Sequence, residues 1–150
     1  MSLGELVKDS TVRASLIADC NRLIDTQVSQ KNGVSGMALK TAYRVVKGIG
    51  PTYVQGAIGR MLPSTLEALE PIWQEGVESG NPGQYLEQHR SRTADRILSV
   101  TDHRIQYSSG PIVGVYNKLR KSVKGDVEAA VPELASILER HQTMALEVTH

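Results

Sequence analysis

The stretch SGMALKTAYRVVK, Ser35–Lys47, has a counterpart later in the chain, SGPIVGVYNKLRK, Ser109–Lys121. Each begins with Ser-Gly, carries a tyrosine in its second half and ends on a basic residue. An aspartate precedes each stretch, at Asp25 and Asp102, and a proline among helically spaced aliphatic residues follows each. The matching aspartates, tyrosines and prolines are 77, 73 and 69 residues apart, so the loops between them differ in length. A period this long predicts a duplicated helical unit rather than a solenoid of short repeats.

The composition is typical of one globular domain. Of the 150 residues, 40% are hydrophobic and 22% are charged, which is enough apolar material for a core and too much for a disordered chain. Phe is absent and Trp occurs once, so the core must be aliphatic, as suits helix packing. The formal net charge of +1 gives no overall attraction to nucleic acid or membranes.

The hydrophobic pattern predicts helices along the whole chain. Apolar residues recur every three or four positions from 11 to 31, and Asp9 or Ser10 is placed to cap that helix. Further helices are expected over 35–47, 52–79, 84–105, 108–123 and 126–145, whereas no segment alternates as a strand would. We therefore expect an all-α bundle of about six to eight helices in a single domain, 1–150. Its two pseudo-symmetric halves would span about 10–79 and 82–145.

Prolines and glycines inside the expected helices predict local irregularities. Pro63 and Pro71 lack the N–H that a helix interior needs, so kinks or short breaks are expected there. Gly56 and Gly59 lie in the same expected helix, where each glycine costs about 1 kcal/mol relative to Ala. Two such residues predict the close approach of a neighbouring helix.

Basic residues are separated from acidic ones along the chain. Residues 37–60 hold four Lys or Arg and no acid, and residues 103–125 hold five and no acid; residues 61–87 hold five Glu and no base. In each basic segment three of the side chains share one helix face. These six residues are candidate anion-binding residues: Lys40, Arg44, Lys47, Lys118, Lys121 and Lys124.

Two interpretations of these basic stripes are open. Brought together by the internal symmetry, they would bind an anionic membrane, nucleic acid or a phosphorylated ligand. Alternatively, each basic helix lies beside an acidic one in solvated ion pairs, and the balance of acids and bases favours this pairing. Aromatic residues that would stack on single-stranded nucleic acid are few near the stripes.

Four polar residues occupy matching positions in the two repeats. Tyr43 and Tyr116 lie on the apolar side of the basic helices, and each is expected to bury its ring while its hydroxyl reaches a polar partner. Asp25 and Asp102 precede them. We predict a symmetric Asp–Tyr or Asp–Arg contact between the repeats; the alternative is two carboxylates meeting at the pseudo-axis as acid and base or as metal ligands.

The sequence contains no recognisable catalytic or metal-binding motif. The four histidines form no metal-binding pair, and there is neither a phosphate-binding P-loop nor a Gly-x-Ser-x-Gly elbow. Cys20 is the only cysteine, and its apolar surroundings predict a buried, unreactive thiol. We therefore expect no enzyme, no catalytic residue, no metal site and no cofactor. No membrane span and no signal peptide is recognised, so a cytoplasmic protein is expected.

Several motifs along most of the chain resemble an uncharacterised bacterial family of small, cytoplasmic, all-helical proteins. The resemblance supports a helical fold and implies no activity, cofactor or catalytic residue. It rests on Met1-Ser-Leu, Lys31-Asn-Gly33-Val-Ser-Gly36 with Lys40 and Tyr43, Leu62-Pro63, Leu69-Glu-Pro71, Leu98-Ser-Val-Thr-Asp102, Tyr116-Asn-Lys-Leu-Arg120 and Val131-Pro132-Glu-Leu134.

Three functions are compatible with these observations. The favoured one is a non-catalytic helical protein that binds a protein partner or itself, for example as a dimer, and this requires an exposed apolar patch. The second is a binder of anionic surfaces, lipid or nucleic acid, through the two basic stripes. The third is a small-ligand binder whose site lies between the repeats, at Asp25, Asp102, Tyr43 and Tyr116.

Overall fold

A computed structural model describes residues 2–149 of the chain. This part forms seven α-helices and one short 3-10 helix, and it contains no strand. The predicted all-α fold and the predicted number of helices are therefore confirmed. In chain order the elements are η1 (Leu3–Val7), α1 (Ser10–Gln30), α2 (Gly33–Ile49), α3 (Tyr53–Glu78), α4 (Pro82–Gln88), α5 (Arg90–Ile105), α6 (Pro111–Leu119) and α7 (Val123–Thr149).

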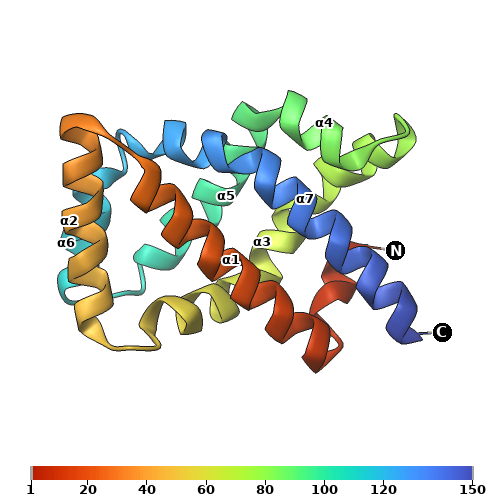
Figure 1. Cartoon of the computed structure of the whole chain (residues 1–150), viewed down its shortest axis with the longest axis horizontal. Helices are drawn as coiled ribbons and strands as arrows, with labels where there is room; N and C mark the ends of the chain where they lie inside the picture. The colour runs from red at the N-terminus through yellow and green to blue at the C-terminus, as the bar shows by residue number, and fades with distance from the viewer. Residues whose placement is uncertain (1, 150) are drawn as a thin grey trace.

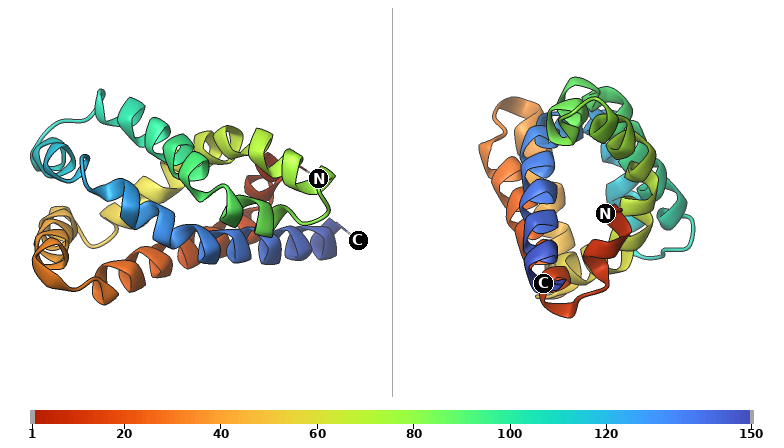
Figure 2. Two further views of the ribbon diagram at one scale, coloured as in Figure 1. Left: turned by 90° about the horizontal axis from the view of Figure 1, so that it is seen from above. Right: turned by 90° about the vertical axis from the view of Figure 1, so that its right-hand side faces the viewer.

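The helices are arranged along one long axis. Helix α1 packs against α7 and α3, and helix α5 packs against α3 and α7. Helices α2 and α6 lie side by side across one end of the molecule, which we call the α2–α6 end (Figures 1 and 2). Helix α4 and both ends of the chain lie at the opposite end, which we call the terminal end (Figure 1).

The hydrophobic core is aliphatic, as predicted, and is built from every element except α2 and α6. Helix α3 supplies Leu62, Leu66, Leu69, Ile72 and the fully buried Trp73. In contrast, the only buried residue of α2 is a glycine, and α6 has no buried residue. The α2–α6 end is therefore attached to the rest of the protein by partly exposed side chains. The other core residues are Leu3, Leu6, Val12, Leu16, Leu86, Ala94, Leu98, Val131, Ala135, Ile137, Leu138 and Ala145.

The predicted cap of α1 is present, and α4 has a cap that was not predicted. The Asp9 carboxylate accepts the backbone N–H groups of Thr11 and Val12, at 2.9 and 3.0 Å, and opens α1. The Asn81 side chain accepts the N–H of Gln84 at 3.1 Å and opens α4. The start predicted for α2 at Ser35 is two residues late, because the helix begins at Gly33.

Kinks or short breaks were predicted at the prolines of α3, and the breaks are absent. Helix α3 runs without interruption through Pro63 and Pro71. Because Pro63 has no N–H to donate, the Gly59 carbonyl one turn earlier loses its helical partner. The Arg13 guanidinium of α1 donates to that carbonyl at 3.3 Å. A side chain from a neighbouring helix thus replaces the missing bond, an arrangement that local sequence reasoning cannot predict.

Close helix packing at glycine occurs at a position other than those predicted. A Cβ at Gly56 would meet only the flexible end of Arg60, and a Cβ at Gly59 would make ordinary contact with Ile17 of α1. At the buried Gly76 of α3, however, a Cβ would lie 2.6 Å from the Cα of Pro82 in α4. The contact between α3 and α4 therefore requires glycine at position 76.

Replacing Gly76 with alanine should therefore destabilise the protein by roughly 1–3 kcal/mol, because the backbone of α4 must move to make room. In a domain of this size this lowers the melting temperature by several degrees, as differential scanning calorimetry would measure. Gly56→Ala is the matched control in the same helix; it should leave stability unchanged or raise it by up to about 1 kcal/mol. Equal melting temperatures for the two variants would contradict the proposed close packing.

Candidate functional site

Helix α2 is attached to α1 by a cluster of three matched polar residues. The Tyr43 hydroxyl donates to Asp25 Oδ1 at 2.5 Å. Lys47 Nζ lies 3.1 Å from the same oxygen and 4.9 Å from the centre of the Tyr43 ring. We call Asp25, Tyr43 and Lys47 the first aspartate cluster. It gives α2 a polar attachment where buried apolar contacts are few.

The second half of the chain contains the corresponding cluster. Tyr116 of α6 donates its hydroxyl to Asp102 of α5 and also lies 2.8 Å from Thr101 Oγ1. Arg120, directly after α6, binds both oxygens of Asp102, at 2.7 and 3.0 Å. We call Asp102, Tyr116 and Arg120 the second aspartate cluster. The contact predicted between the repeats is therefore wrong in one respect: each aspartate binds the tyrosine of its own half.

These contacts fix the protonation states of both clusters. The hydrogen bond from Tyr43, helped by Lys47, lowers the pKa of Asp25, and the hydrogen bonds from Arg120 and Tyr116 lower the pKa of Asp102. Burial, followed by the hydrogen bond to the aspartate, raises the pKa of each tyrosine. At neutral pH both clusters therefore hold a carboxylate and a protonated phenol. The aspartates do not meet as an acid–base pair.

A cavity of about 240 Å³ lies between the two clusters. Tyr43 lines it from α2 and Tyr116 lines it from α6. Most other lining side chains are aliphatic and come from α1, α2, α3, α5 and α6. They include Ile24, Val46, Val54, Ile58, Ile105 and Ile112. The tyrosines predicted at the interface between the halves therefore do face one shared space, with their hydroxyls bound to aspartate.

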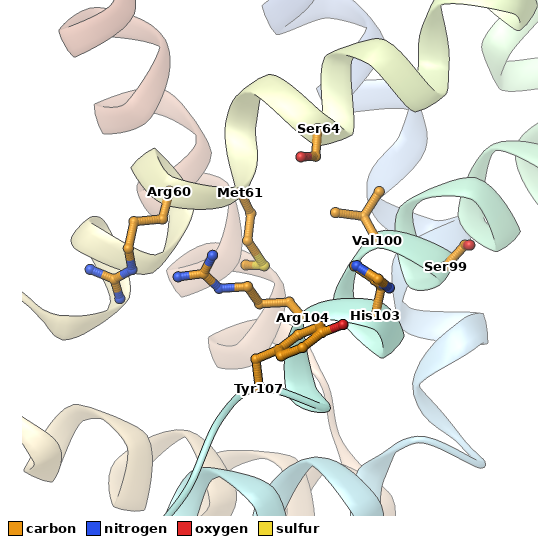
Figure 3. Close-up of a pocket in the computed structure, with 8 residues that line it drawn as sticks. All are labelled: Arg60, Met61, Ser64, Ser99, Val100, His103, Arg104 and Tyr107. Carbon is orange, nitrogen blue, oxygen red and sulfur yellow. The ribbon is translucent and has the colours of Figure 1, made fainter.

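A second hollow, of about 440 Å³, adjoins this cavity between α3 and α5 (Figure 3). Arg60, Met61 and Arg104 line both spaces. The two guanidinium groups lie on the same side of Met61 (Figure 3). Within residues 2–149 neither arginine has an ion-pair partner. The border between the two spaces is therefore positively charged.

The outer face of α2 is apolar and exposed. Val34 and Met37 are 87% and 71% exposed, and Val45 and Ile49 are 44% and 42% exposed. With Ala38, Thr41 and Gly48, which are also exposed, they form one continuous face of the helix. We call these seven residues the α2 outer stripe. Sequence periodicity missed the stripe because α2 is apolar on both its inner and its outer side.

The six candidate anion-binding residues divide into two groups. Lys47 binds Asp25 and Lys124 binds Asp95, so these two form the ion pairs that the balance of charge favours. Lys40, Arg44, Lys118 and Lys121 have no acidic partner among the described residues. They lie on or next to α2 and α6, whereas the glutamates of residues 67–87 lie on α3 and α4, toward the terminal end. Basic and acidic segments are therefore mostly separated in space.

The terminal end contains a polar cluster that the sequence did not indicate. Arg92 of α5 binds both oxygens of Glu75 in α3, at 3.0 and 2.7 Å, and Tyr85 of α4 donates to the same carboxylate at 2.8 Å. The Arg92 hydrogen bond is the main reason that the pKa of Glu75 is lowered to about 2. This cluster joins three helices and is structural.

Other reactive side chains offer no site. Burial raises the pKa of the Cys20 thiol to about 11, so the thiol stays protonated at neutral pH. His141 is buried and joins α7 to α1 through Ser15 and Asp19, each 3.2 Å from Nε2. Within the described residues no three His, Cys, Asp or Glu side chains gather as metal ligands, and no helix has both the length and the apolar character to cross a bilayer.

Asp102→Asn should weaken the attachment of α6, because Arg120 and Tyr116 lose their charged acceptor. We expect a loss of about 1 kcal/mol, since the Asp102 side chain is 40% exposed, and a melting temperature lower by a few degrees. Asp95→Asn is the matched control on α5, because its pair with Lys124 is 59% exposed at the carboxylate. Equal losses for both variants would show that the second aspartate cluster has no special role.

The Asp102→Asn variant also gives a prediction about pH dependence. The pKa of Asp102 is lower in the folded protein than in the unfolded chain, so the cluster stabilises the fold fully above about pH 4 and loses this effect as the pH falls further. The difference in melting temperature between wild type and Asp102→Asn should be constant near neutral pH and shrink below about pH 4. A difference that is unchanged in acid would contradict the carboxylate contacts.

Comparison with known proteins identifies the family and no activity. No curated protein and no solved structure matches the chain significantly. A family described only as of unknown function, DUF6918, matches residues 3–142. This match covers nearly the whole chain and all the residues of both aspartate clusters. The chain therefore belongs to the family of unknown function DUF6918.

Proposed function

We propose that this protein is a non-catalytic helical protein that binds anionic membrane surfaces peripherally through its α2–α6 end. One observation carries the proposal: the exposed α2 outer stripe lies next to basic side chains that have no acidic partner in the described chain. Aliphatic residues on one side of a helix and Lys or Arg beside them are the pattern of helices that lie in a membrane interface.

Both parts of this surface would contribute to binding. Each basic residue near an anionic bilayer adds about 1 kcal/mol. Four such residues, Lys40, Arg44, Lys118 and Lys121, are free to act in this way. Val34 and Met37, the most exposed members of the stripe, would enter the boundary between headgroups and acyl chains.

The chemistry of the stripe favours lipid over nucleic acid. Binding of single strands depends on exposed aromatic rings on which bases stack. The α2 outer stripe is aliphatic, and the one ring of α2, Tyr43, is turned to the cavity with its hydroxyl bound to Asp25. A lipid surface uses both the charge and the aliphatic side chains.

The same stripe is the exposed apolar patch that a protein partner or a dimer requires. If two copies of the chain associated through their α2 helices, the twofold contact would pair identical surfaces and bring like charges together. The segregation of charge thus argues against a dimer through this face. Self-association through α2 is accordingly an outcome that the experiments below would reveal.

We also propose that the chain arose by duplication, and that the duplication explains why both basic stripes lie at the α2–α6 end. The helix contacts support this proposal. Helix α1 packs against α3 and α7, and helix α5 packs against α7 and α3, as expected if α1–α3 correspond to α5–α7. The two aspartate clusters occupy matching positions in this correspondence. Helices α2 and α6 are then equivalent, and they meet at one end with both basic stripes.

Wild-type protein should co-sediment with vesicles made of equal parts of phosphatidylcholine and phosphatidylglycerol, but not with phosphatidylcholine alone, and binding should weaken with added salt. The double variant Lys40→Gln/Arg44→Gln should bind at least about tenfold more weakly, because two favourable charges are lost. The double variant Arg90→Gln/Arg96→Gln is the control: it makes the same charge change at exposed residues of α5 that lack acidic partners. Equal effects of the two doubles would contradict a site on α2.

A second pair of variants tests the apolar contribution. Val45→Asp should greatly reduce vesicle binding, whereas Val77→Asp should not, although the two valines are 44% and 49% exposed on α2 and α3. Two further measurements accompany this test. Fluorescence anisotropy measures the binding of labelled single-stranded and duplex DNA, and light scattering after gel filtration measures the oligomeric state. DNA binding without vesicle binding, or a dimer that Val45→Asp dissociates, would overturn the lipid proposal in favour of that other partner.

A further inference from the structure

The cavity behind α2 and α6 has a mostly apolar lining and one charged border. Its volume is about 240 Å³, and it opens beside the hollow of about 440 Å³ between α3 and α5. Arg60 and Arg104 line both spaces, and neither has an acidic partner in residues 2–149. Together the two spaces fall within the size range of ordinary small-molecule sites.

Besides the arginines, the polar side chains that line the cavity are three tyrosines, Thr101 and Ser108, and the Thr101 and Ser108 hydroxyls donate to the backbone carbonyls of Leu98 and Arg104. The hydroxyls of Tyr43 and Tyr116 are bound to Asp25 and Asp102, so the rings rather than the hydroxyls are available. The aspartates do not line the cavity. The free charge at this site is therefore positive and is concentrated at the two arginines.

We propose that this site binds a small amphiphilic anion. Its aliphatic body would occupy the cavity between the two tyrosine rings, and its carboxylate or phosphate head would lie at Arg60 and Arg104. Arginine is suited to this role because its planar guanidinium binds carboxylate and phosphate oxygens in pairs. The aliphatic lining, which includes Ile58 and Ile105, excludes a ligand that is polar throughout.

This inference concerns residues other than those of the proposed membrane surface. The arginines come from α3 and α5, whereas the surface is built from exposed side chains on or next to α2 and α6. It also differs from the ligand site predicted from sequence. In that prediction Asp25 and Asp102 were binding groups; here they hold the tyrosines, and the arginines bind the ligand.

Isothermal titration calorimetry with sodium decanoate, below the concentration at which it forms micelles, tests the site. Octyl phosphate, as the second probe, distinguishes a phosphate head from a carboxylate head, and decanol is the uncharged control. Wild-type protein should bind at least one of the two anions and bind decanol at least about tenfold more weakly, because decanol lacks the charge that pairs with arginine. Absence of anion binding, or equal affinity for decanol, would overturn the proposal.

Three variants locate the binding. Arg104→Gln should weaken binding of the anion about tenfold and leave decanol unaffected. Arg96→Gln is the matched control, an exposed arginine of the same helix that lines none of these spaces, and it should change neither. Ala57→Trp fills the cavity and should abolish binding of the anion; a circular-dichroism melt establishes that this variant is folded. If Arg96→Gln weakens binding as much as Arg104→Gln, or if folded Ala57→Trp still binds, the site is elsewhere.

The two proposals fail separately. Lys40→Gln/Arg44→Gln should leave decanoate binding intact. Arg104→Gln should weaken vesicle binding no more than the single-charge control Arg96→Gln does. Vesicle binding without decanoate or octyl phosphate binding would refute the cavity site alone. Anion binding in the calorimeter without vesicle binding would refute the membrane surface alone.

Discussion

Helices α2 and α6 have almost no share in the hydrophobic core, so the two aspartate clusters must hold them in place. In each cluster one carboxylate accepts a tyrosine hydroxyl from the outer helix and binds a cation one turn further on. A partly buried carboxylate is stable only when such donors satisfy it, and the donors here come from the helix that needs an attachment. The position of the α2–α6 end therefore depends on Asp25 and Asp102.

This mode of attachment has two consequences for function. Because polar groups hold the inner side of α2, the helix is not required to bury all its apolar residues, and Val34, Met37, Val45 and Ile49 face outward. The two tyrosines, whose hydroxyls are bound to the aspartates, line a space together with aliphatic side chains and two arginines. An exposed apolar surface and an open cavity thus have a common structural origin. The first is the surface that we propose for an anionic bilayer, and the second is the site that we propose for a small amphiphilic anion.

Local features of the sequence predicted much of the secondary structure, and contacts between helices explain most of the errors. Asp9 caps α1 through its own sequence neighbours, so the sequence was sufficient to identify it as a cap. The breaks expected at Pro63 and Pro71 are absent, and at Pro63 Arg13 supplies a donor from a different helix. Similarly, Gly76 rather than Gly56 permits close packing, because α4 crosses α3 at Gly76.

The sequence by itself determined that this protein is all-helical, that its core is aliphatic, and that aspartate, tyrosine and a base recur in the same order in both halves. These features follow from capping, periodicity and composition, none of which depends on contacts between distant parts of the chain. Only the tertiary structure decided which tyrosine each aspartate binds, which of the six basic residues remain unpaired, and that Arg60 and Arg104 border one cavity. A helix carries side chains on all its sides, and the neighbours that cover each side come from distant parts of the chain. Exposure and charge pairing, on which the proposed function rests, are therefore properties of the packed molecule.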